Sequence, residues 1–203
     1  MAPPALSPEY DPAGFAEAVR LWDAHLEKPD VSPYLVYRAA RFFVPHDKPR
    51  AEQLILKGLA MDPKSEALKG RMPENVAGYQ WPSQLGMLYA SALLGSQHYG
   101  YPRYDADRAR SPFAMAVRQK LSASNDPRLL VQVGQYLARR APDDAGAEDI
   151  RALGATYLQR ALQLDPDMTS ARSVLVSLRS RDRHNRMYEA RRSNSPILEE
   201  DRL

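Results

Sequence analysis

The sequence contains no cysteine among its 203 residues. This absence excludes a disulfide framework, a thiolate zinc site and a cysteine nucleophile. It leaves the compartment open, since a chain without cysteine is stable in either redox environment. Long apolar runs are also missing. The longest uncharged stretch, residues 75–102, is diluted by polar residues, and its apolar centre, residues 85–95, is shorter than the ~20 residues that a membrane-spanning helix needs. We therefore expect no membrane span.

A large excess of one charge sign is absent too. There are 28 Lys and Arg residues against 25 Asp and Glu residues, which gives a formal charge of +3. That charge is too small to indicate a nucleic-acid partner by itself. Apolar residues make up 44% of the chain, which is enough for a packed core. The length then fits one domain or a short array of repeats.

Motifs of catalysis are also missing. The four histidines lie in separate segments, and none belongs to a metal-binding spacing such as HExxH. No glycine-rich phosphate loop occurs, and Gly95-Ser96 lacks the second glycine of a nucleophile elbow. His98 with Asp105 and Asp107 could converge on a metal, although a loop rich in Tyr and Pro explains that segment more simply. We expect a protein that is not an enzyme and that holds no metal or cofactor.

The first eight residues do not have the pattern of a signal peptide. Met-Ala-Pro-Pro-Ala-Leu-Ser-Pro has neither a basic region nor an apolar region, so we expect that it is not a signal peptide. This favours a cytoplasmic location. A mature exported fragment with an added Met would look the same.

Helical periodicity is what the sequence does contain. Apolar residues recur at spacings of three and four, no segment alternates as a strand does, and Pro and Gly cluster between the periodic segments. We expect an all-α protein whose second helix begins at residue 33. The other helices are expected at residues 12–28, 49–61, 82–96, 107–122, 127–140, 147–164 and 168–190. Each apolar stripe is too narrow to fold alone, so neighbouring helices must stack, as they do in a solenoid.

An internal repeat supports this interpretation. Residues 51–63 align with residues 154–166, and both segments end in an apolar residue followed by Asp-Pro. Small residues occupy the same two positions of each segment, first Ala51 and Gly154 and then Gly58 and Ala161. Small side chains at fixed spacing are typical of helices that approach each other closely.

These segments resemble the second helix of a tetratricopeptide repeat. The first helix of such a repeat has a bulky residue, two adjacent core residues and a further large one, and three segments fit: Leu35, Arg38-Ala39 and Phe42; Leu85-Gly86 and Tyr89; Leu130, Val133-Gly134 and Leu137. The resemblance covers residues 31–63 and 127–166 well and 82–122 loosely. The chain departs from the family in Arg38, in the ending of the middle repeat and in an extra stretch at 141–147. An ordinary helical bundle is the alternative.

The resemblance implies a right-handed α-α superhelix of about three helix pairs. We expect an N-terminal segment and helix at residues 1–30, the repeat array at 31–166, a basic capping helix at 167–192 and a frayed acidic tail at 193–203.

The same resemblance implies a scaffold that binds a protein or peptide of unknown identity in a concave groove. The groove residues would be Tyr37, Ala40, Phe43, Gln84, Met87, Ala90, Arg128, Gln132, Gln135 and Arg139. The last four occupy one helical face, where amides and guanidinium groups could bind a peptide backbone or a carboxylate; a solvated face is the alternative. The Lys and Asn residues with which one subclass grips the C-termini of heat-shock chaperones are missing, so that role is disfavoured.

Two further segments are candidate contacts. Tyr99, Tyr101 and Tyr104 lie in a Gly/Pro loop and either pack over a repeat junction or contact a partner.

The segment from Arg172 to Arg192 holds seven arginines against Asp182 and Glu189. It is either a solvated capping helix whose Val174, Leu175 and Leu178 close the array, a surface for an acidic partner or nucleic acid, or a membrane-surface helix. Nucleic acid and membrane are disfavoured, since aromatic interleaving and apolar residues are too few. The alternative function is a structural subunit of a larger assembly that could self-associate, with an enzymatic helical domain as a distant third alternative, and the oligomeric state is open.

Overall fold

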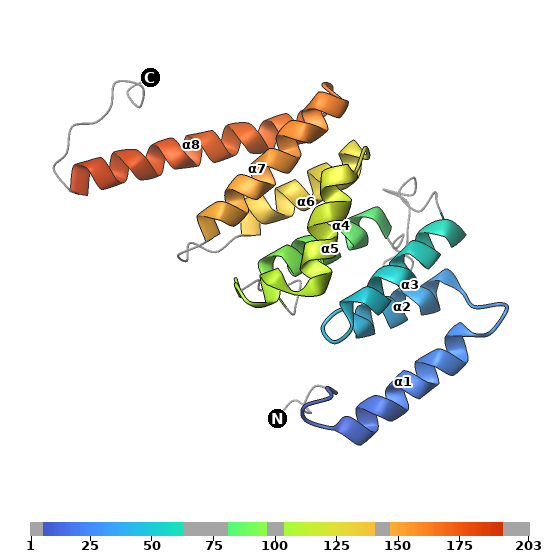
Figure 1. The fold of residues 1–203 in the computed structure, drawn as a ribbon. Coiled ribbons are helices and arrows are strands. Elements are labelled where there is room, and N and C mark those ends of the chain that lie inside the picture. The colour runs from blue at the N-terminus through green and yellow to red at the C-terminus, as the bar shows by residue number, and fades with distance from the viewer. Residues whose placement is uncertain (1–5, 63–80, 97–103, 141–146, 193–203) are drawn as a thin grey trace, which may run out of the picture. The chain divides into compact units, whose positions relative to one another are not determined.

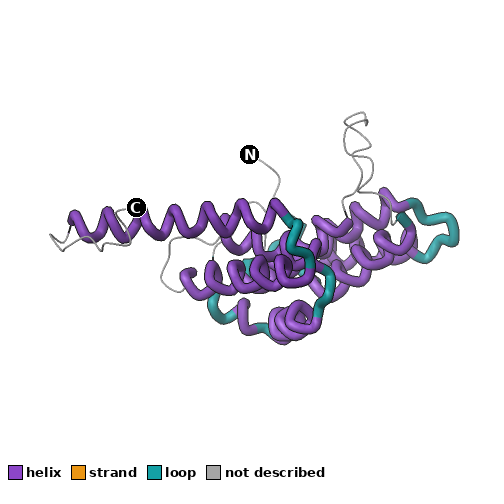
Figure 2. The backbone as a smooth tube through the Cα atoms, turned by 90° about the horizontal axis from the view of Figure 1, so that it is seen from above, coloured by secondary structure: helices purple, strands orange, loops and turns teal. Residues whose placement is uncertain are grey.

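All the regular structure in the described part of the chain is helical. The computed structural model describes residues 6–62, 81–96, 104–140 and 147–192, and Figures 1 and 2 show helices and loops in them but no strand. The helices are α1 Pro12–Leu26, α2 Pro33–Phe43, α3 Lys48–Met61, α4 Trp81–Leu94, the short 3-10 helix η3 Arg108–Arg110, α5 Pro112–Ala123, α6 Pro127–Arg140, α7 Ala147–Leu164 and α8 Thr169–Arg192. The expected all-α class is therefore confirmed.

The first three helices begin as the sequence predicts. Asp11, Ser32 and Asp47 each precede a helix, and their side chains accept a hydrogen bond from the backbone N–H three residues later. Each helix also has Pro in its first turn, where the missing N–H costs nothing because it would have no partner within the helix.

One expected helix begins later than predicted. Residues 107–122 form two elements, η3 and α5, because Ser111 between them is extended, with φ −57° and ψ 156°. Pro112 accounts for the break, since a proline ring disfavours the helical conformation of the residue before it. The Ser111 hydroxyl then accepts a hydrogen bond from Ala114 N at 3.3 Å and caps α5.

The chain forms two compact units, Met1–Ala123 and Ser124–Leu203, named the N-terminal and C-terminal units. In the N-terminal unit α2 packs on α3 and α3 on α4. The core contains Val36, Phe43, Ile55 and Trp81, each at most 2% exposed. Helix α1 buries no residue fully and contacts α2 through stacked Phe15 and Phe42 rings, whose centroids are 5.3 Å apart.

In the C-terminal unit α6 and α7 cross at two glycines. A Cβ atom at position 134 would lie 2.8 Å from the carbonyl oxygen of Gly154, and one at position 154 would lie 2.9 Å from that of Gly134. Only residues without a side chain allow the two backbones to come this close. Leu130, Leu137 and Leu158 fill the surrounding core, and each is fully buried.

The aligned repeat segments share their pattern of burial. Ala51 and Gly154, Ile55 and Leu158, and Gly58 and Ala161 are buried at corresponding positions of α3 and α7. The two helices therefore use the same face to pack within their own units.

Candidate functional site

Helix α6 separates its apolar residues from its polar residues. Asp126 caps the helix, and its carboxylate accepts hydrogen bonds from the backbone N–H of Arg128 at 2.9 Å and of Leu129 at 3.3 Å. The buried side contains Leu130, Val133 and Leu137. The opposite side contains the four predicted polar residues, which we name the α6 polar face: Arg128 and Arg139, which are exposed, and Gln132 and Gln135, which are half-buried.

The predicted groove residues of the N-terminal unit have a different environment. Tyr37 is half-buried; its ring contacts Trp81 edge-on, with 6.0 Å between centroids, and Arg41 donates to its hydroxyl at 3.3 Å. Gln84 and Met87 are half-buried on α4, whereas Ala40 and Ala90 belong to the core, at most 2% exposed.

The prediction that Phe43 lines the groove is wrong, because its side chain is buried. The side chain is 2% exposed, because the Arg50 guanidinium lies 4.0 Å from its ring centroid and Phe42 packs edge-on against it. It stabilises the core and offers no surface to a partner. Of the expected loop contacts, Tyr104 is half-buried, while Tyr99 and Tyr101 lie outside the described residues.

A buried polar cluster, which was not predicted from the sequence, joins α3, α4 and α5. The carboxylate of Glu52, a residue only 7% exposed, accepts hydrogen bonds from the Tyr89 hydroxyl and from the Lys120 ammonium, the latter at 2.7 Å. Burial, and then the neighbouring Glu52 carboxylate, raise the pKa of Tyr89 above its usual range. An acid beside the small core residue Ala51 is the one sign of this cluster in the sequence. The geometry of the cluster indicates a structural role, in which its hydrogen bonds connect three helices.

Lys48 is a second half-buried titratable group. Its ammonium donates to the carbonyl oxygens of Val44 at 3.4 Å and Ser96 at 2.9 Å, which lie just beyond the ends of α2 and α4. Burial, and to a lesser extent the charge of Arg108, lower the pKa of Lys48 to about 8. Donation to carbonyls at two helix ends is a structural role.

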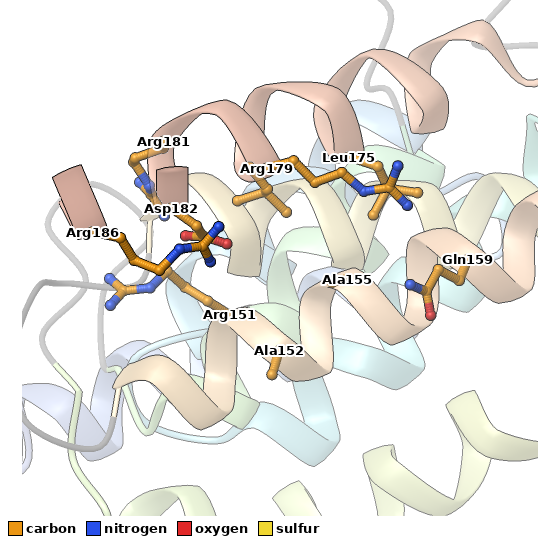
Figure 3. Close-up of a pocket in the computed structure, with 10 residues that line it drawn as sticks. Arg151, Ala152, Ala155, Gln159, Leu175, Arg179, Arg181, Asp182 and Arg186 are labelled. Carbon is orange, nitrogen blue, oxygen red and sulfur yellow. The ribbon is translucent and has the colours of Figure 1, made fainter. Parts of the chain in front are cut away.

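A concave surface lies between α7 and α8, and we name it the α7–α8 cleft (Figure 3). Its volume is about 460 Å³. Residues from both helices line it: Arg151, Ala152, Ala155 and Gln159 from α7, and Leu175, Leu178, Arg179, Arg181, Asp182 and Arg186 from α8. Four arginines against one aspartate give the lining a formal excess of three positive charges. The basic character of α8 and its packing against the last helix pair were expected from the sequence, but the cleft between α7 and α8 was not.

Neither a metal site nor a membrane span is found among residues 6–62, 81–96, 104–140 and 147–192. They contain no group of three or more His, Asp or Glu side chains placed to hold a metal ion. Asp105, a candidate ligand, accepts hydrogen bonds from the backbone N–H of Asp107 and Arg108, and His98 lies outside the described residues. No helix in these ranges is both long enough and apolar enough to cross a bilayer.

Comparison with known protein families, with curated proteins and with solved structures found no match. The described residues therefore define a class only: an all-α protein with packed helix pairs, a polar face on α6 and an arginine-rich cleft between α7 and α8.

Proposed function

We propose that this chain is a non-catalytic, protein-binding module of the tetratricopeptide-like type, and that the α6 polar face contacts the partner. The observation that carries the proposal is the division of α6 into two sides. One side is committed to the core, while Arg128, Gln132, Gln135 and Arg139 retain exposed area on the other. Four long polar side chains in one row supply the donors and acceptors that a peptide ligand needs.

The chemistry of this row suits an extended peptide. Each glutamine amide both donates and accepts hydrogen bonds, which matches the alternating N–H and C=O groups of a peptide backbone. The two arginines stand at the ends of the row and present planar donor groups that suit carboxylates. In solenoid proteins, the first helices of successive repeats supply such binding rows, and α6 has the position of a first helix in the pair α6–α7.

Selection from a displayed library of random peptides tests the proposal. The full chain serves as bait, beside a Gln132→Ala/Arg139→Ala variant and a control, Gln163→Ala/Arg183→Ala. The control removes the same two residue types from exposed positions on α7 and α8. We expect enriched peptides that bind the wild-type chain and the control but not the α6 variant. Peptides that bind all three chains equally, or no enrichment, would overturn the proposal.

Self-association is the competing function, and sedimentation separates it from peptide binding. Exposed apolar side chains near α1 and α2, such as Tyr10, Leu21 and Tyr34, would favour it. A mass that rises with concentration in both the wild-type chain and the α6 variant, without peptide enrichment, would identify a structural subunit instead.

A further inference from the structure

Helix α8 both covers the C-terminal unit and forms one wall of the α7–α8 cleft. Ala171 and Val174 are at most 2% exposed, so the first half of α8 is packed into the core. Arg181 donates to the carbonyl oxygen of Ala138 at 3.4 Å and ties the helix to α6. These contacts fix the wall from which the remaining arginines project.

The lining of the cleft combines aliphatic and basic side chains. Ala152, Ala155, Leu175 and Leu178 supply aliphatic surface. Figure 3 shows Arg151 and Arg186 at the end of the cleft that also holds Asp182, and Gln159 and Leu175 toward the other end. The lining contains four arginines and one aspartate, so its formal charge is positive. A concave basic surface concentrates anions more strongly than a flat one.

The lining distinguishes among anionic ligands. Arginine forks bind a carboxylate through two parallel hydrogen bonds, and neighbouring aliphatic surface suits an apolar side chain. Single-stranded nucleic acid favours aromatic residues on which bases stack, and none of the ten lining residues is aromatic. A membrane-surface helix needs a broad outward apolar face, whereas Leu175 and Leu178 face α7 in the cleft.

We propose that the α7–α8 cleft binds an acidic segment of a partner protein, one in which carboxylates alternate with apolar side chains. Arg151, Arg179 and Arg186 bind the carboxylates, and Leu175 and Leu178 contact an apolar side chain of the segment. This surface is separate from the α6 polar face, so the inference does not depend on the proposed function.

Fluorescence anisotropy with a defined probe tests this inference. The probe is a labelled peptide that repeats Glu-Glu-Leu, and the reference probe has Gln in place of each Glu. The full chain is compared with Arg179→Glu/Arg186→Glu and with Arg183→Glu/Arg192→Glu, which changes the net charge equally at exposed α8 positions outside the cleft. Arg179→Gln/Arg186→Gln serves as a second cleft variant if the first loses helicity by circular dichroism.

We expect the cleft variants to bind the acidic probe at least tenfold more weakly, the control to bind within about twofold of the wild type, and the Gln probe to bind poorly. Gln132→Ala/Arg139→Ala should retain full affinity for this probe. Equal weakening in the cleft and control variants would overturn the proposal, because it would indicate diffuse charge attraction. Absence of binding would also overturn it, as would tighter binding of single-stranded DNA or phosphatidylserine vesicles that is lost in the cleft variants.

Discussion

Replacement of Gly58 by leucine should destabilise the N-terminal unit through one identifiable contact. A Cβ atom at position 58 would lie 2.3 Å from both Cζ2 and Cη2 of Trp81. Non-bonded carbon atoms are stable at roughly 3.5–4.0 Å, so the ring or the helix would have to move. Trp81 is 0% exposed and has no open side into which it could turn.

The magnitude follows from two opposing effects. Leucine gains about 0.8 kcal/mol over glycine in helix propensity. Overpacking a close-packed core costs about 1–3 kcal/mol, and we take the upper end because four side-chain carbons must enter beside a fully buried ring. The free energy of unfolding should therefore fall by about 2 kcal/mol.

Tryptophan fluorescence during urea unfolding measures this change selectively. The chain has two tryptophans, Trp22 and Trp81, and both lie in the N-terminal unit. Ala60→Leu is the matched control, because Ala60 is exposed on the same helix. We expect a lower midpoint for Gly58→Leu and an unchanged one for the control. Equal midpoints for Gly58→Leu and the wild type would refute the assigned packing of α3 against Trp81.

Three further predictions address other contacts. Gly154→Ala should destabilise the chain by about 1–2 kcal/mol, because its methyl group would lie 2.9 Å from the Gly134 carbonyl oxygen. The loss should appear as a lower melting temperature in circular dichroism, and an unchanged melting temperature would contradict it. Tyr89→Phe should lower the free energy of unfolding by about 1.5–3 kcal/mol, since it removes a hydrogen bond to a buried carboxylate. The control is Tyr34→Phe on an exposed side chain, which should leave the urea midpoint unchanged. Between pH 8 and 10.5 the unfolded chain should keep the Lys48 proton that the folded chain has released. The free energy of unfolding of the wild type should therefore rise with pH relative to that of Lys48→Met. Parallel pH profiles of stability for the two chains would contradict the lowered pKa of Lys48.

Local sequence signals predicted most of the helices because they act over three or four residues. Ser32-Pro33 and Asp47 before Pro49 specify helix starts through a cap and a fixed φ angle, and the structure has both. The same chemistry at Ser111-Pro112 begins α5 inside the range expected as one helix, 107–122, so the α-helix starts later than predicted. A Ser-Pro pair inside an apolar pattern indicates that a new helix begins there, and not that one helix continues through it.

The candidate sites were less predictable because they depend on packing between distant segments. Phe43 occupies a groove position by spacing, but Arg50 covers its ring, and that contact forms only after the chain turns between α2 and α3. The polar row on α6 was predictable because one helix supplies all four residues. The α7–α8 cleft was not, since residues from 151 to 186 form it only when α8 packs along α7.

The central claim is that the α6 polar face binds the partner. The most direct test of this claim is to measure the affinity of one selected peptide for three chains. The chains are the wild type, Gln132→Ala/Arg139→Ala and Gln163→Ala/Arg183→Ala, each shown by thermal melting to be folded. We predict that the α6 variant binds at least tenfold more weakly than the wild type, and that the control binds within about twofold of it. Equal affinity for all three chains would contradict the claim and leave the α6 polar face as a solvated surface.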